Sequence, residues 1–165
     1  KQYEIKIDKK ETGGSLFDKL AVLGGEAIVD TIANFDSIVP SPQGEATTEY
    51  AKMISKSMGE IDFNKTAVEI ERLIRGMNPW PSAYTKYQGK VLKIWEAEVA
   101  ENISELPNIN LSENYGKIYS FNSRIFIICN QSILEVLSLQ LEGKKRMSAK
   151  DFLMGRDIEQ GYKLG

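Results

Sequence analysis

Few residues of this chain could perform acid–base or nucleophilic chemistry. Its 165 residues include no histidine and a single cysteine, Cys129. Ser-His-Asp and Cys-His catalysis both use histidine as the general base, so neither can be assembled from this sequence alone. The same counts exclude zinc sites built from cysteine and histidine. Glu96 and Glu98 could suggest an acid–base pair, but the solvated face of a strand explains their spacing better.

Basic side chains form the second group, because contacts to phosphate dominate the affinity of proteins for nucleic acids. Four basic residues fall within seven positions, with no acidic residue among them: Lys144, Lys145, Arg146 and Lys150. Bulk charge gives no such signal. Residues 1–65 carry 8 basic and 11 acidic side chains, and residues 66–165 carry 13 and 12. A nucleic-acid surface would therefore depend on local clustering.

Two further pairs of lysines are candidates for the same surface. Lys52 and Lys56 are four residues apart, so a helical turn would place them on one side. Lys90 and Lys93 lie on or beside an expected hairpin, and Lys93 falls on an otherwise apolar strand face, where its stem can pack while its ammonium reaches water. On charge alone, a solvated loop explains the basic cluster at residues 144–150 better than RNA binding does.

The element that precedes the expected strands is an amphipathic helix. Its apolar residues recur at i, i+3, i+4 and i+7, as in a core-facing stripe: Ile70, Leu73, Ile74 and Met77. Asn64 or Thr66 would cap its start. Pro79 and Pro81 prevent its continuation, and Trp80 between them is expected to be a packing anchor.

Beyond this turn the apolar period changes to that of strands. We expect a hairpin with a turn at Gln88-Gly89, a long loop over residues 100–116, and a short helix that Ser148 caps. The expected strands are Ala83–Tyr87, Lys90–Val99, Lys117–Phe121, Arg124–Cys129 and Ile133–Leu141. Trp95 is placed on the inner face. The fold class is α+β: an OB-like five-stranded antiparallel barrel with flanking helices.

For the first 64 residues, the sequence predicts one strand, one helix and a linker. Tyr3, Ile5 and Ile7 alternate with charged residues and predict a strand. A helix capped by Ser15 should follow, with a bend or close packing at Gly24-Gly25. The segment starting Pro40-Ser41-Pro42 predicts a linker over residues 40–64.

Several segments, in this order, resemble methionyl-tRNA formyltransferase. They are Thr12–Ala21, Ala46–Lys56, Ile61–Phe63, Ile74–Pro81, Gly89–Trp95, Leu139–Gln140, Gly143–Met147 and Asp151–Gly155. The resemblance implies three parts: the end of a Rossmann-like formyltransferase domain (1–39), an interdomain linker (40–64) and an OB-like C-terminal tRNA-binding domain (65–165). The chain would thus be a C-terminal fragment.

That family transfers a formyl group from 10-formyltetrahydrofolate to methionyl-initiator tRNA in translation initiation. Its Asn-His-Asp catalytic set and its folate site lie upstream, so the resemblance places no catalytic residue, no folate and no metal in this chain. The fragment alone is expected to be inactive. Its expected partners are initiator methionyl-tRNA and the missing catalytic domain. No apolar run could span a bilayer and no signal peptide is seen, so a cytoplasmic location is expected.

The resemblance also implies roles for individual residues. The expected tRNA-binding residues are Lys144, Lys145, Arg146, Lys150, Lys52, Lys56, Lys90 and Lys93. The expected domain-interface or structural residues are Arg75, Asn78, Pro79, Trp80 and Pro81, and Arg75 is expected to pair with a carboxylate across the domain interface. Residues 1–39 would expose apolar helix surface, which predicts self-association or a retained partner fragment.

Two alternatives remain open. One is a fragment of another 10-formyltetrahydrofolate-dependent transferase that acts on an amino sugar or a different amine; the segment Gly143–Met147 favours the tRNA enzyme. The other is a stand-alone RNA-binding module, which would have no need of the strand and helix in residues 1–39.

Overall fold

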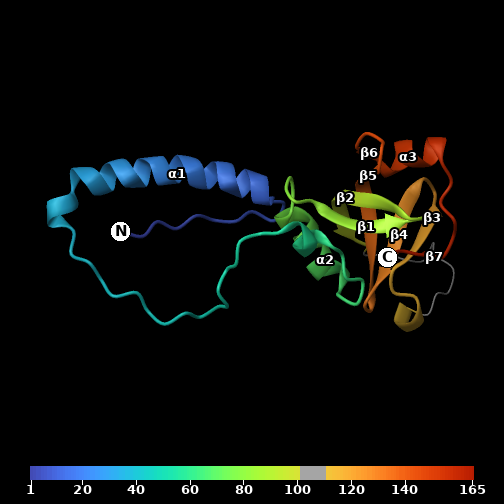
Figure 1. Ribbon diagram of the computed structural model, residues 1–165, viewed down its shortest axis with the longest axis horizontal. Helices are drawn as coiled ribbons and strands as arrows, with labels where there is room; N and C mark the ends of the chain where they lie inside the picture. Colours follow the sequence, from blue (N-terminus) through green and yellow to red (C-terminus); the bar gives the residue numbers. More distant parts are fainter. Residues whose placement is uncertain (101–110) are drawn as a thin grey trace.

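The molecule consists of a curled sheet with a long arm projecting from it (Figure 1). The structure is a computed structural model that describes residues 1–100 and 111–165. We call residues 1–58 the arm and residues 59–165 the body. In the arm, helix α1 (Gly13–Ala33) lies beside the extended N-terminal segment, and the linker returns from its far end to the body.

The body is built on one antiparallel sheet with the strand order β1-β2-β5-β4-β3-β7, and β6 pairs with β5. Its strands are β1 (Ala83–Tyr87), β2 (Lys90–Val99), β3 (Lys117–Phe121), β4 (Arg124–Cys129), β5 (Ser132–Leu141), β6 (Met147–Ser148) and β7 (Tyr162–Lys163). The five expected strands are β1–β5. The two short strands β6 and β7 were not expected, so the sheet has seven strands rather than five.

Strand β1 is an edge of this sheet, and two other segments cover it. The carbonyl of Tyr84 accepts a hydrogen bond from the backbone nitrogen of Ile61 at 2.9 Å, and that of Lys86 accepts one from Gly165 at 3.2 Å. Carbonyls two residues apart in a strand point to the same side. The end of the linker and the C-terminal segment therefore share the free edge of β1.

Helices α2 (Ala67–Gly76) and α3 (Ala149–Gly155) pack against the sheet. Thr66 caps α2 in a reciprocal capping box with Glu69, and Ser148 caps α3. In α2 the side chains of Ile70 and Ile74 are 1% exposed, as the apolar stripe predicts. The hairpin of β1 and β2 turns at Gln88 and Gly89, both with positive φ, as predicted.

The inward face of β2 differs from the expectation. Its buried side chains are Leu92, Ile94 and Ala97, and the pairing register with β5 shifts between Ile94 and Ala97. A bulge at this point lets Ile94 and Ala97 point inward although they are three residues apart. The placement of Trp95 on the inner face was therefore wrong, since it lies on the outer face between two inward residues.

The arm also corrects three expectations. Residues 3–7 are extended but form no strand, because no described segment pairs with them. Helix α1 is capped by Thr12 in a capping box with Ser15, so it begins before the expected cap. It continues through Gly24 and Gly25 without a break, and a Cβ at either glycine would meet no atom within 4 Å.

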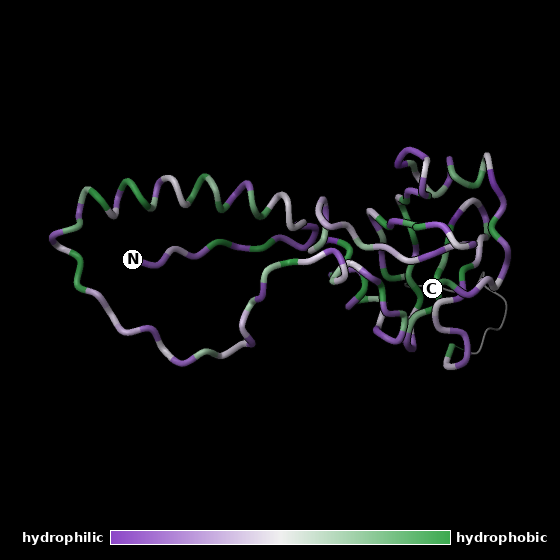
Figure 2. The backbone as a smooth tube through the Cα atoms, in the orientation of Figure 1, coloured by the Kyte–Doolittle hydropathy of each residue, from purple (hydrophilic) through white to green (hydrophobic). Residues whose placement is uncertain are grey.

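No side chain of α1 is buried, although apolar residues lie along its length (Figure 2). Short 3-10 turns follow at Phe35–Ser37 (η1) and Lys56–Gly59 (η2), and a third lies at Leu111–Glu113 (η3). Most of the loop expected over residues 100–116 lies outside the described residues. Across the described ranges, no helix is both long and apolar enough to cross a bilayer.

Candidate nucleic-acid interface

The outer face of strands β1, β2 and β5 carries aromatic and basic side chains side by side. In the register of the sheet, Lys93 of β2 stands opposite Tyr84 of β1 and Gln140 of β5. Its neighbours Leu92 and Ile94 point into the core, so this row faces outward. Trp95 continues the same face of β2. An aromatic group that holds cations in place on a sheet surface is an arrangement that can bind phosphates.

Trp95 lies between two cations of this face. The Lys93 ammonium is 5.7 Å from the centre of the Trp95 ring, and the Arg146 guanidinium carbon is 5.2 Å from it. Both distances are within the range of cation–π attraction. The indole nitrogen donates a hydrogen bond to the Gln140 side-chain oxygen at 3.2 Å, which fixes the orientation of the ring.

Arg146 is held in place by groups of β5 and β2. Its Nε donates to the Ser138 hydroxyl at 3.0 Å, and its guanidinium forms an ion pair with Glu96. The guanidinium is thus oriented over Trp95 before any ligand arrives. Glu96 offsets part of the positive charge, so Arg146 contributes here through position as well as charge.

The turn between β5 and β6 presents two more lysines. Gly143 adopts a positive φ of 74°, and the backbone nitrogen of Lys144 donates a hydrogen bond to the Leu141 carbonyl at 2.9 Å. The Gln140 side chain donates to the Lys144 carbonyl at 2.9 Å. Lys144 and Lys145 are exposed, and neither has an ion-pair partner within the part of the chain that the structure describes.

The structure brings together only some of the expected RNA-binding residues. Lys93, Lys144, Lys145 and Arg146 lie on or beside the outer face. Exposed Lys90 begins β2, and exposed Lys150 lies in the first turn of α3.

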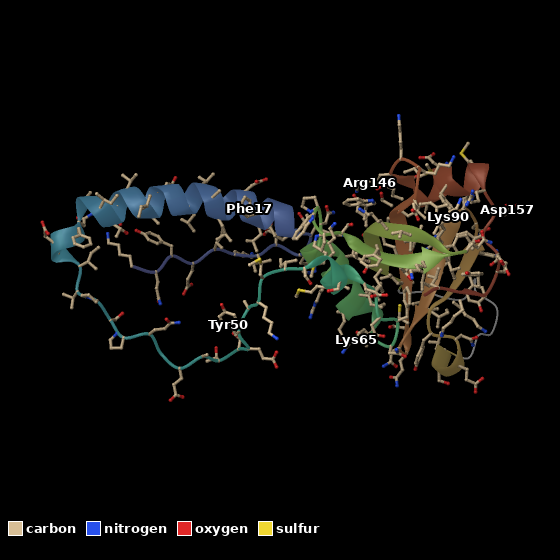
Figure 3. The ribbon with its side chains drawn as sticks, in the orientation of Figure 1. Phe17, Tyr50, Lys65, Lys90, Arg146 and Asp157 are labelled. Carbon is tan, nitrogen blue, oxygen red and sulfur yellow. The ribbon has the colours of Figure 1, made fainter. Side chains whose placement is uncertain are left out.

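The two linker lysines do not belong to this group. Lys56 lies in η2, but Lys52 lies outside any helix, so they do not share one side of a helical turn as expected. Tyr50, two residues before Lys52, lies in the linker, well away from Arg146 (Figure 3).

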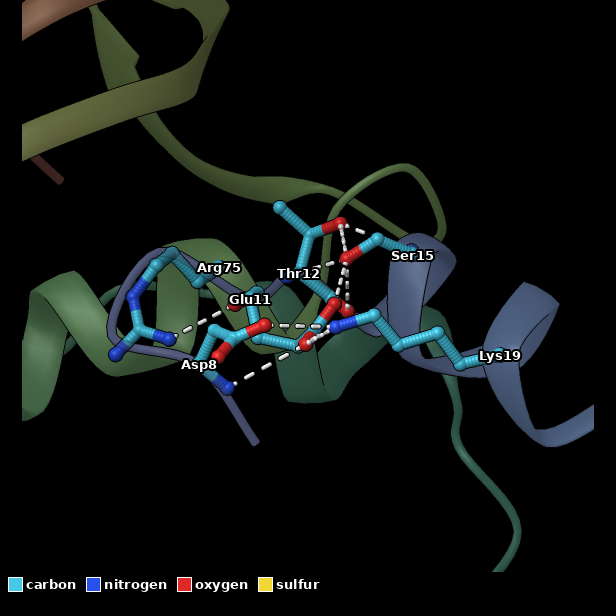
Figure 4. Close-up of polar contacts among 6 residues, drawn as sticks. All are labelled: Asp8, Glu11, Thr12, Ser15, Lys19 and Arg75. Atoms are coloured by element: carbon cyan, nitrogen blue, oxygen red, sulfur yellow. Dashed lines mark hydrogen bonds and ion pairs between the residues drawn. The ribbon is translucent and has the colours of Figure 1, made fainter. Parts of the chain in front are cut away.

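Among the expected structural residues, Arg75 and Asn78 contact the arm, and Figure 4 shows Arg75 beside Glu11. Arg75 pairs with Glu71 on its own helix at 2.6 Å and donates to the backbone carbonyl of Glu11 at 2.8 Å. Its carboxylate partner is therefore within α2, and its contact across to the arm is with a carbonyl. Asn78 accepts a hydrogen bond from the backbone nitrogen of Gly14 at 2.9 Å.

Pro79, Trp80 and Pro81 complete this turn, and both X-Pro bonds are cis. The expectation that Trp80 is a packing anchor was wrong, because 58% of its surface is exposed.

The Glu11 carboxylate forms a network of hydrogen bonds that was not predicted from the sequence. Its side chain is buried and accepts hydrogen bonds from Lys19 and the Ser15 hydroxyl. These bonds lower the pKa of the Glu11 carboxyl to about 2. Lys19 also pairs with Asp8 at 2.8 Å (Figure 4). The spacing of Glu11 and Ser15, four residues apart at a helix start, was the available signal.

Comparisons with known proteins find relatives of this sequence. The family described as "Formyl transferase, C-terminal domain" matches residues 53–157. A methionyl-tRNA formyltransferase from Lachnospira eligens is 47% identical over 98% of this chain and 52% of its own length. One from Alkaliphilus oremlandii is 39% identical over 98% and 51%. The chain thus spans about half the length of the curated relatives it matches.

Solved structures show the same fold at low identity. A structure of HypX from Aquifex aeolicus is similar with a TM-score of 0.57 and 14% identity, over 88% of this chain and 26% of that one. A second HypX structure gives a TM-score of 0.56 and 13% identity, over 90% and 26%.

Proposed function

Because the chain belongs to the family of formyl transferase C-terminal domains, we propose that it is the C-terminal half of a methionyl-tRNA formyltransferase and that its body binds tRNA. The complete enzyme would transfer a formyl group from 10-formyltetrahydrofolate to methionyl-initiator tRNA in the cytoplasm, during translation initiation. The identity of 47% to such an enzyme over 98% of this chain is the main support. The half described here would position the RNA substrate.

The chemistry of formyl transfer would lie in the other half of the enzyme. A formyl carbonyl must be polarised and a proton removed from the attacking amine, and histidine commonly serves as such a base near neutral pH. This chain has none. The folate co-substrate would bind beside the catalytic residues of the other half, and this half alone would be inactive.

The proposed division of the chain follows the resemblance. Residues 1–39 would end a Rossmann-like formyltransferase domain, residues 40–64 would form the linker, and residues 65–165 would form an OB-like tRNA-binding domain. The five long strands and their flanking helices support the last assignment. The separation of arm and body in space supports the first two (Figure 1).

The outer face of β1, β2 and β5 is the proposed RNA contact. The observation that carries this proposal is the placement of Trp95 between Lys93 and Arg146, 5.7 and 5.2 Å from the ring centre. Lys144 and Lys145 extend the positive surface from the neighbouring turn, and Lys90 and Lys150 would add to its margin. Lys52 and Lys56 would contact RNA separately, from the linker.

The proposed partner of α1 is the catalytic half. Apolar side chains of α1 are widely exposed, among them Phe17 at 72% and Val29 at 68%. Single exposed apolar residues are ordinary, but a whole helix of them is typical of an interface. Without the other half, this surface would drive self-association, which sedimentation would detect as a mass above that of the monomer.

Titration with initiator methionyl-tRNA at several salt concentrations tests the proposal. We expect measurable binding that weakens steeply with salt. Replacing Lys144, Lys145 and Arg146 by Ala should weaken binding and reduce the salt slope by about 1 per lost phosphate contact.

A matched control removes the same charge elsewhere. Exposed Lys6, Lys9 and Lys65 replaced by Ala should leave the slope nearly unchanged. Absence of binding at low salt, or equal losses in the two triple variants, would contradict a role for this face.

A further inference from the structure

The turn of residues 76–82 touches both ends of the long arm excursion. Residues 13 and 14 reach it where α1 begins, and residue 59 reaches it where the linker ends. These two places are far apart in sequence and meet at one short turn. At each of them a glycine allows the backbones to approach more closely than any other residue would.

At the first contact, α1 starts directly against the turn. A Cβ on Gly13 would lie 2.3 Å from the Gly76 carbonyl oxygen, and one on Gly14 would lie 2.7 Å from the Pro79 ring. The Gly14 backbone nitrogen also donates to the Asn78 carbonyl at 2.9 Å. Both glycines have ordinary helical φ, so space and not backbone conformation demands glycine here.

At the second contact, the linker docks on the end of the same turn. A Cβ on Gly59 would lie 2.3 Å from the Ser82 carbonyl oxygen. The following residue, Glu60, forms a parallel bridge with Tyr84, and Ile61 donates to the Tyr84 carbonyl at 2.9 Å. The linker is thus held at Ser82 before it joins the edge of the sheet.

Polar contacts reinforce the first of these places. Arg75, which precedes the turn, donates to the Glu11 carbonyl at 2.8 Å. The Glu11 side chain binds Ser15 and Lys19 on the first turns of α1 (Figure 4). The start of α1 is therefore tied to α2 through two successive sets of bonds.

We propose that the turn Gly76–Ser82 is a clamp that holds both ends of residues 15–58 and so fixes the direction of α1 relative to the body. Gly13 and Gly59 are its positioning residues. If the proposed function holds, the clamp sets the distance between the RNA face of the body and the catalytic half that packs on α1. The geometry of the clamp itself does not depend on that function.

Distance measurement between two spin labels tests the clamp in this chain. Glu26→Cys places a label on α1, and Asp157→Cys places one on the body, both at exposed positions. Cys129 is buried, and burial raises the pKa of its thiol to about 12, so it should not compete for the label. Pulsed electron resonance then gives the distribution of distances between arm and body.

Gly13→Ala and Gly59→Ala should each shift or broaden this distribution, and the double variant should broaden it further, because two clamped ends are released instead of one. Gly24→Ala is the matched control, since its Cβ meets nothing within 4 Å, and it should change nothing. Unchanged distributions in both Gly13→Ala and Gly59→Ala would overturn the clamp.

Amide hydrogen exchange in the unmodified chain gives a second test that does not depend on how the variants fold. The amides of Gly14 and Ile61 should exchange more slowly than that of Thr47 in the middle of the linker. Equal exchange rates at these three positions would overturn the clamp. Neither experiment contains RNA, so failure of the clamp and failure of tRNA binding are told apart.

Discussion

The body and the arm contain similar apolar side chains, which are buried in the body and exposed in the arm. Ile127 in the body is fully buried, whereas Ile32 in the arm is 68% exposed. The same type of side chain is thus buried in one region and exposed in the other. An apolar pattern therefore predicts which side chains can be buried. Whether they are buried depends on a second element that packs against them.

Helices α1 and α2 show this contrast most directly. In α2 the apolar residues form one stripe, and that stripe packs on the sheet. In α1 apolar residues occur all around the helix, which is typical of a helix buried inside a larger protein. The apolar side chains of α1 thus lack the packing that the stripe of α2 finds on the sheet, within the part of the chain that the structure describes.

The largest expected effect separates the two regions by stability. Ile127→Ala should lower the free energy of unfolding by about 2–5 kcal/mol, because it leaves a cavity in the core. Ile32→Ala should change it by less than about 0.5 kcal/mol, since the side chain is exposed. Urea unfolding followed by tryptophan fluorescence measures both. A comparable loss for Ile32→Ala would show that α1 is packed in solution.

Aromatic side chains of the two regions should differ in RNA binding. Trp95→Ala should weaken tRNA binding by about 0.5–2 kcal/mol, because it removes the ring that holds Lys93 and Arg146 in place by cation–π attraction. Tyr50→Ala removes an aromatic ring of the arm that is 88% exposed, and should have little effect. Fluorescence titration with tRNA at one fixed salt concentration compares the two variants. Equal losses would place RNA contacts along the linker as much as on the sheet.

The caps of α1 and α2 should contribute differently to the stability of the body. Thr66→Ala should lower the free energy of unfolding of the body by about 1 kcal/mol, because it removes the capping bond to Glu69. Thr12→Ala removes the equivalent bond in α1. It should reduce the helical circular-dichroism signal while leaving the unfolding midpoint of the body unchanged. A shift of that midpoint by Thr12→Ala would mean that arm and body unfold together.

The smallest expected effect concerns acid pH and the arm. Hydrogen bonds from Lys19 and Ser15 lower the pKa of the Glu11 carboxyl from 4.5 to about 2. The stabilisation is thus fully present above about pH 4.5 and is lost as the pH falls towards 2. Carbon-13 titration of the Glu11 carboxyl should give this low pKa, and Lys19→Met should raise it. Lys9→Met is the control, and an equal shift there would contradict the assigned partner.

Sequence reasoning succeeded where local chemistry decides the structure. The hairpin of β1 and β2 was placed correctly because Gly89 suits the positive φ of the turn, and α3 was placed correctly because Ser148 is a good cap. It failed at residues 3–7, since a strand needs a neighbour that this chain does not supply among its described residues. A pattern cannot show the absence of a partner.

The candidate site was predicted by residue type more than by arrangement. Arg146 and Lys93 were named from sequence, but the position of Trp95 between them was not, because a bulge in β2 reverses which side chains face inward. Strict alternation cannot reveal a bulge. The contacts of Gly13 and Gly59 were not predicted either, because they depend on backbone segments that come close together only in the folded chain.

The two segments that cover β1 can pair with it only at different times during synthesis of the chain. Ile61 precedes β1 in the chain, so its bond to Tyr84 can form as soon as the strand leaves the ribosome. Gly165 comes after every strand of the sheet, so its bond to Lys86 forms last. Half of this edge thus stays open while the remaining strands are made, and an open strand edge invites pairing with other chains. Nascent chains halted before residue 165 should therefore need a chaperone more than the complete chain does.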